Sequence, residues 1–71
     1  MLKSQRRALK LLASSADGVT EGLLLANRVT TETLLELVNA GYATAHVDKL
    51  GRPRIEVARL RITPAGLKAI G

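Results

Sequence analysis

The stretch VTTETLLELVNAGY, Val29 to Tyr42, indicates one short helix with a marked beginning and a marked end. Thr30 is a suitable N-cap, because its hydroxyl can accept a hydrogen bond from a free backbone N–H in the first turn. The apolar residues recur at i, i+3 and i+4: Leu34, Leu37 and Val38. Gly41 follows the last of them, where a left-handed C-terminal cap favours glycine. The stretch therefore predicts a helix with one apolar face.

A basic helix is predicted before it, over Ser4 to Ser15, with Ser4 as its cap. Three apolar residues share one face: Leu9, Leu12 and Ala16. Four cations recur at helical spacing on the opposite side: Lys3, Arg6, Arg7 and Lys10. These cations form either a solvated face or a patch that faces phosphates, and the spacing alone leaves both open.

A second, short helix should begin at Thr20, after the turn signal Asp17-Gly18 and a single extended residue. Its sequence is apolar nearly all round from Leu23 to Ala26, so we expect it to be largely buried. Asn27 tolerates a left-handed backbone and suits the tight turn that follows. Two helices joined by about three to four residues make a helix-turn-helix by connection length.

The hydrophobic period changes to two after Gly41, which predicts a β-hairpin. The first strand alternates from Ala43, the turn lies at Lys49 to Pro53, and the second strand spans Arg54 to Ile62. The second strand is out of phase: Ile55 and Val57 fall on one face, and Ala58, Leu60 and Ile62 on the other. Either a bulge near Val57 and Ala58 restores the phase, or the outer hairpin is free of the core.

A last helix should begin at Thr63-Pro64, because proline is favoured at the first helical position. Leu67 and Ile70 can then pack back on the core.

The chain has 71 residues, enough for a single domain spanning 1–71 with a small core that contains no Phe and no Trp. Eleven Lys and Arg against six Asp and Glu give a net charge of +5. This balance favours a polyanionic or acidic partner, although solubility alone accounts for a charge of this size.

Catalytic and metal-binding functions are poorly supported by the sequence. There is no cysteine, so disulfides and thiolate metal sites are excluded, and His46 is the only histidine. The carboxylates are scattered, and no phosphate-binding loop is present. We expect no enzyme activity, no metal and no cofactor. No stretch is apolar enough to span a membrane and no secretory signal is visible, so we expect a cytoplasmic protein.

The order of these elements resembles the winged helix-turn-helix domain, and in particular that of MarR-type bacterial regulators. The residues that carry the resemblance are Leu37 to Tyr42 at the end of a recognition helix, Asp48 to Arg54 in a wing, and Ile62-Thr63-Pro64-Ala65-Gly66 at the start of the last helix. The resemblance covers nearly the whole chain. It implies an α+β fold with a three-helix core, a two-stranded β-hairpin wing and a short C-terminal helix.

The resemblance also implies binding of double-stranded DNA, with a recognition helix at about 30–40 in the major groove and a wing at about 48–61 on phosphates or the minor groove. In the helix-turn-helix the implied contacts are Arg28, Thr30, Thr31 and Thr33, with Asn39 at the far end of the helix. In the wing they are Lys49, Arg52 and Arg54. Thr30 can act as a cap, as a base contact, or as both. Such a protein would act as a homodimer or with a protein partner, because one small domain makes few phosphate contacts.

The charges of the two implied DNA-binding elements differ. Five cations against two acids give the wing a net charge of +3, whereas Arg28 to Tyr42 has one cation against two acids, Glu32 and Glu36. DNA binding and transcriptional regulation is therefore the leading hypothesis. The alternative is a winged-helix adaptor that binds a protein through the Glu32–Glu36 face without binding DNA.

Overall fold

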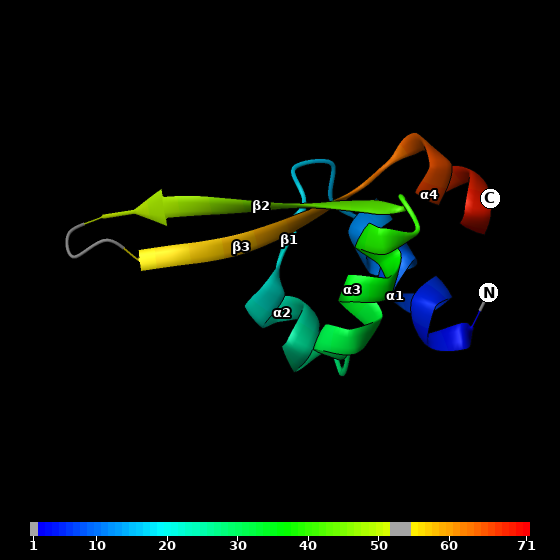
Figure 1. Ribbon diagram of the computed structural model, residues 1–71, viewed down its shortest axis with the longest axis horizontal. Coiled ribbons are helices and arrows are strands. Elements are labelled where there is room, and N and C mark those ends of the chain that lie inside the picture. Colours follow the sequence, from blue (N-terminus) through cyan, green and yellow to red (C-terminus); the bar gives the residue numbers. More distant parts are fainter. Residues whose placement is uncertain (1, 52–54) are drawn as a thin grey trace.

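The computed structural model describes residues 2–51 and 55–71 and forms a small α+β domain. The elements are α1 (Lys3–Ala13), β1 (Val19–Thr20), α2 (Glu21–Ala26), α3 (Thr31–Asn39), β2 (Ala43–Leu50), β3 (Ile55–Ile62) and α4 (Pro64–Ile70) (Figure 1). In the described residues there are thus four helices and a three-stranded antiparallel sheet, in the predicted order. None of these helices combines the length and the hydrophobicity that a membrane span requires.

Threonine side chains cap three of the helices. Thr20, Thr30 and Thr63 each accept a hydrogen bond from the backbone N–H three residues later. These contacts confirm all three predicted helix starts. The predicted cap Ser4 is wrong, because α1 already begins at Lys3 and Leu2 occupies its cap position. Leu2 has no side-chain oxygen, and the Gln5 Oε1 accepts from the Leu2 N–H at 3.3 Å instead.

The sheet has the strand order β1-β3-β2. β2 and β3 pair without interruption from Ala43 opposite Ile62 to Leu50 opposite Ile55. The bulge predicted as one alternative is therefore absent from this ladder. The other alternative is confirmed: the hairpin projects beyond the core, and Val47 on it is 53% exposed (Figure 1).

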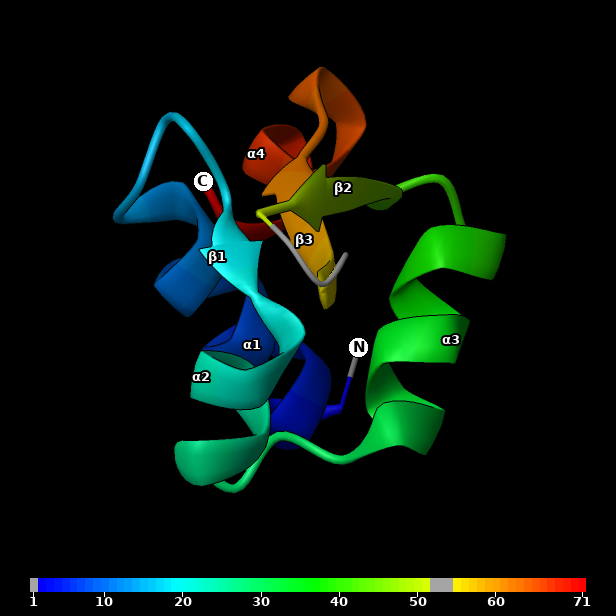
Figure 2. The same cartoon turned by 90° about the vertical axis from the view of Figure 1, so that its left-hand side faces the viewer.

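The core lies where α1, α2 and α3 meet the inner part of the sheet. Four leucines are its largest fully buried side chains: Leu9, Leu12, Leu24 and Leu37. Viewed from the hairpin end, α2 and α3 lie on opposite sides of the hairpin, below it (Figure 2). Leu34 and Leu37 of α3 are buried, so the predicted apolar stripe of this helix is confirmed.

Three burial predictions are wrong. In α2 only Leu24 is buried, whereas Leu23 and Leu25 are 55% and 43% exposed, because this helix of six residues packs only one face on the core. Leu67 of α4 is 50% exposed, whereas Ile70, together with Ala69, packs partly against the core. Ala16 lies beyond the end of α1 and is exposed.

Two glycines inside helices offer opposite tests of this packing. A Cβ on Gly66 of α4 would collide with the Tyr42 carbonyl oxygen and lie 2.8 Å from the Ile62 Cγ1, whereas a Cβ on Gly22 of α2 meets nothing within 4 Å. We expect Gly66→Ala to lower the free energy of unfolding by about 1–3 kcal/mol through overpacking. Gly22→Ala should raise it by roughly 0.5–1 kcal/mol, since alanine favours a helix over glycine.

Urea unfolding followed by circular dichroism measures both variants. Equal effects of the two substitutions would contradict the close approach of α4 to Tyr42.

Candidate nucleic-acid interface

The connection between α2 and α3 is closed by two backbone hydrogen bonds. The Arg28 N–H donates to the Leu25 carbonyl and the Val29 N–H donates to the Leu24 carbonyl, each at 3.0 Å. This pair of bonds defines the Schellman motif, which requires a left-handed residue just after the helix. Arg28 occupies that position with a φ of 66°. The motif buries Val29 against Leu24, so the tight turn has a hydrophobic anchor.

The prediction that Asn27 carries the left-handed backbone is wrong. Asn27 has a φ of −91°, and its side-chain amide donates to the Leu23 carbonyl at 2.8 Å. The left-handed residue is instead Arg28, the only described residue other than glycine with a positive φ. At the end of α3, the equivalent position in the same motif is held by Gly41, with a φ of 80°. Arginine at this position is unfavourable, because a Cβ in the left-handed region costs about 1–2 kcal/mol.

One basic side chain of α1, that of Arg7, contacts this turn. Four cations of α1 are exposed: Lys3, Arg6, Arg7 and Lys10. The Arg7 guanidinium donates to the Asn27 carbonyl, directly before Arg28. We call these four residues and Arg28 the basic surface. The sequence placed the α1 cations on the solvent side, which is confirmed, but no local pattern indicates a contact between residues 20 positions apart.

The first turn of α3 separates the three threonines that the sequence analysis grouped together. Thr30 and Thr31 are exposed and follow Arg28 directly. The Thr30 hydroxyl is already committed, because it accepts from the Thr33 N–H at 3.1 Å and donates to the Thr33 Oγ1 at 2.9 Å. Thr33 is only 8% exposed. The structure therefore brings Arg28, Thr30 and Thr31 together at the surface but does not place Thr33 with them.

The outward face of α3 carries no cation. Its exposed residues are Thr31, Glu32, Leu35 and Asn39, and Leu35 is 59% exposed. Glu36 turns toward α1, where its Oε2 accepts from the Gln5 side-chain amide at 2.5 Å. Of the two acids in α3, Glu36 is thus paired with α1, and Glu32 remains exposed on the outer face.

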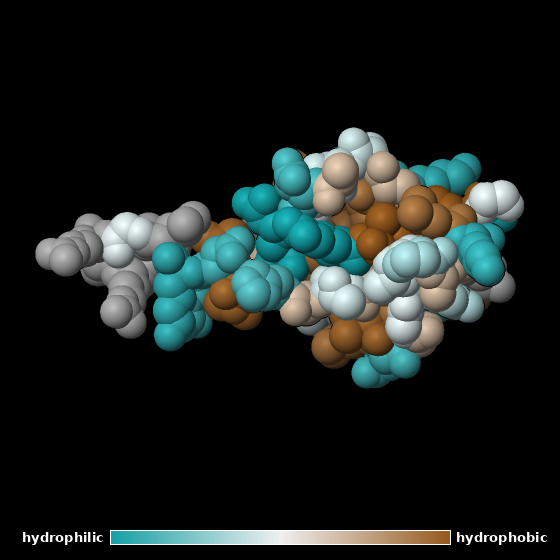
Figure 3. Space-filling view, turned by 90° about the horizontal axis from the view of Figure 1, so that it is seen from above, coloured by the Kyte–Doolittle hydropathy of each residue, from teal (hydrophilic) through white to brown (hydrophobic). Residues whose placement is uncertain are grey.

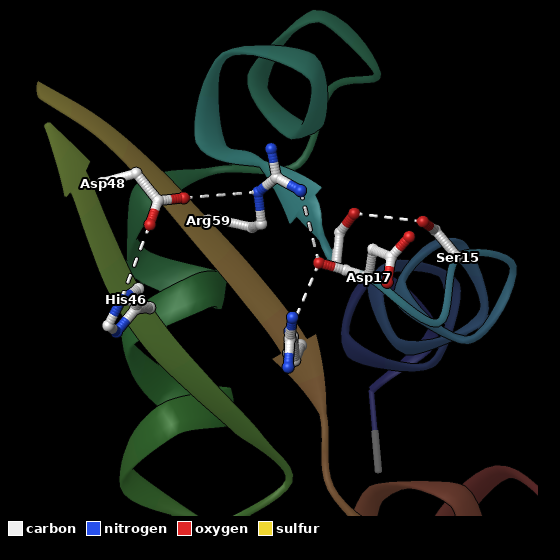
Figure 4. Close-up of polar contacts among 7 residues, drawn as sticks. Ser15, Asp17, His46, Asp48 and Arg59 are labelled. Atoms are coloured by element: carbon white, nitrogen blue, oxygen red, sulfur yellow. Dashed lines mark hydrogen bonds and ion pairs between the residues drawn. The ribbon is translucent and has the colours of Figure 1, made fainter. Parts of the chain in front are cut away.

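The outer face of the sheet is polar and internally paired. From β2, His46 Nε2 and Asp48 Oδ1 approach within 3.5 Å, and Asp48 Oδ2 lies 3.7 Å from Arg59 Nε (Figure 4). Arg59 and Arg61 of β3 both donate to the Asp17 carbonyl, at 3.4 and 3.2 Å. Through these hydrogen bonds the two arginines attach the loop between α1 and β1 to the sheet, so their side chains have a structural role. From above, a hydrophilic band covers the root of the hairpin, and hydrophobic patches lie over the half of the domain that holds α4 (Figure 3).

Of the three predicted wing contacts, only Lys49 lies in the described part of the chain. Lys49 is exposed on β2, and its partner across the ladder is Glu56. Arg52 and Arg54 lie outside the described residues. Among the residues the structure describes, no three His, Cys, Asp or Glu side chains gather as a metal ion would require.

Comparisons of the chain with protein-family models, with curated proteins and with solved structures found no match.

The backbone of Arg28 generates a direct stability test. Arg28→Gly should raise the free energy of unfolding by roughly 0.5–1 kcal/mol, because glycine adopts a positive φ without a Cβ penalty. Arg28→Ala removes the same charge but keeps a Cβ, so it should leave stability within about 0.5 kcal/mol of the parent. Thermal and urea unfolding of the three proteins provide the comparison. If glycine were no more stable than alanine here, the left-handed conformation of Arg28 would be contradicted.

Proposed function

We propose that this chain is a winged helix-turn-helix domain, similar to those of MarR-type regulators, that binds double-stranded DNA in transcriptional regulation. The order of elements, the short connection between α2 and α3 and the projecting hairpin all support this interpretation. Because no comparison found a match, the proposal depends on the residues themselves.

The observation that carries the proposal is Arg28. A left-handed position in a Schellman motif favours glycine, and residues held in unfavourable backbone regions concentrate at functional sites. The cation is exposed directly before the capped N-terminus of α3, where free N–H groups and the helix dipole also favour an anion. We infer that the charge of Arg28 is retained for phosphate binding at the expense of backbone stability.

The rest of the basic surface provides long-range attraction. The Arg7 contact holds α1 against the turn, so the cations of α1 and Arg28 belong to one connected part of the molecule. Contacts of lysine ammonium and arginine guanidinium groups with phosphates position a protein on a duplex without reading its sequence. Thr31 is the exposed α3 side chain nearest to Arg28 in the chain and is suited to a phosphate or a thymine methyl.

The adaptor alternative is favoured by the outward face of α3. Glu32 and Leu35 form a mixed acidic and apolar surface on a helix with no Lys or Arg. A face of this composition is unfavourable against phosphates and is suited to a protein. DNA titration distinguishes the two proposals. DNA binding predicts a response at Arg28, Thr30 and Thr31, whereas the adaptor predicts none.

Titration with a random 20-base-pair duplex tests DNA binding. At low salt we expect amide NMR shifts at Arg28, Thr30 and Thr31 that fade as salt rises. Arg28→Gly should weaken binding roughly three- to tenfold and make the negative slope of log K against log salt less steep by about 1, since one phosphate contact is lost.

Lys68→Gln is the matched control, because it removes one exposed cation from α4 instead of from the basic surface. If both variants lost the same DNA affinity, the effect would come from net charge alone and not from the position of Arg28. No shift at low salt would remove DNA binding and favour the adaptor.

A further inference from the structure

β3 has a strand edge that β1 leaves largely uncovered. β1 pairs with β3 only at Leu60 and Arg59. On that side, within the described part of the chain, no strand lies beside β3 from Glu56 to Ala58. The other side of the same segment is paired with β2. An uncovered edge presents backbone N–H and C=O groups that a further strand can pair with.

A hollow lies beside this edge. It measures about 320 Å³, and the residues that line it come from α2 and β3: Glu21, Gly22, Leu25, Glu56, Val57 and Ala58. We call these six residues the strand-edge groove. The lining is open at Gly22, where a Cβ would meet nothing within 4 Å. Figure 2 shows α2 below the hairpin on the side of β1, and the hollow is lined by residues of this helix and of β3.

The groove continues under the hairpin into an apolar hollow of about 100 Å³. Glu21 and Ala58 line both hollows, and α3 closes the far side with Leu34, Leu35 and Val38. Leu25 and Leu35, at the two ends of this continuous surface, are 43% and 59% exposed. Aliphatic side chains of an added segment would therefore gain apolar contacts along it.

The charge of the groove is opposite to that of the molecule. Two of its six residues are acids, Glu21 and Glu56, and among the residues that the structure describes no Lys or Arg lines either hollow, although the chain has a net charge of +5. Lys49 lies opposite Glu56 in the ladder but does not line either hollow. Side chains that enter the groove should thus be aliphatic or basic.

We propose that the strand-edge groove receives an extended segment of a partner protein. The segment pairs as a strand with Glu56 to Ala58, and its groove-facing side chains are aliphatic with a Lys or Arg opposite Glu21 and Glu56. Main-chain bonds to the sheet edge supply affinity and the alternate side chains supply specificity. Pairing of two copies through the same edge is disfavoured, because it would bring both pairs of acids into one interface.

The probe is a blocked seven-residue peptide of alternating Thr and Val with a central Lys in place of one Val. Its control peptides carry Glu in place of that Lys, or Pro in place of a neighbouring Thr. On titration into labelled protein, the Lys peptide should shift the amides of Glu21 to Leu25 and of Glu56 to Ala58. The Glu peptide should bind more weakly, and the Pro peptide should lose binding because proline cannot donate to the ladder.

The double variant Glu21→Gln, Glu56→Gln should bind the Lys peptide roughly three- to tenfold more weakly. Glu32→Gln controls for the loss of an acidic charge elsewhere and is compared with each single groove variant, since Glu32 is an exposed acid that does not line the groove. Arg28→Gly should leave peptide binding unchanged, so failure of DNA binding and failure of this proposal are separate results.

Equal binding of the Lys and Glu peptides, or shifts confined to other surfaces, would overturn the proposal. Sedimentation equilibrium and amide hydrogen exchange give a further criterion. Self-association that also protects the Glu56 to Ala58 amides from exchange would overturn the proposal and assign the edge to a second copy of the chain.

Discussion

The turn between α2 and α3 constrains the rest of the domain, and it depends on two backbone hydrogen bonds at its centre. The Arg28 and Val29 N–H groups return to the last turn of α2, which ends that helix and reverses the chain within three residues. Val29 then enters the core and Thr30 is left in the extended conformation that an N-cap requires. One turn geometry thus fixes both the angle at which α3 packs and the residue at which it begins.

The local boundaries of the fold could be predicted from the sequence, because their causes are local. A threonine cap bonds three residues ahead, and Gly41 ends α3 in the same motif that Arg28 closes after α2. The prediction for Asn27 fails for a related reason: asparagine is the better left-handed residue by intrinsic preference, yet the length of α2 sets which residue falls on the left-handed position. Preference indicates a turn here, but packing of Leu24 and Val29 selects its register.

Tertiary placement was less predictable, and the candidate site depends on it. Thr33 looks like an exposed polar residue in the sequence, whereas in the fold it is 8% exposed and bonded to Thr30. The contacts of Arg7 with Asn27 and of Gln5 with Glu36 join residues 20 and 31 positions apart. No periodicity contains such information. The uncertain phase of β3 has a physical origin as well, since a hairpin that leaves the core has no buried face to impose one.

The separation of charge in this domain follows from the same geometry. The cations of α1 are exposed and Arg7 among them reaches the α2–α3 turn, while Glu21 of α2 and Glu56 of β3 line the groove beneath the hairpin. A duplex on the basic surface and a strand in the strand-edge groove would therefore contact different elements and opposite charges. α2 lies between the two surfaces in the chain, because its C-terminal end leads into the turn before Arg28 and its residues Glu21 and Gly22 line the groove.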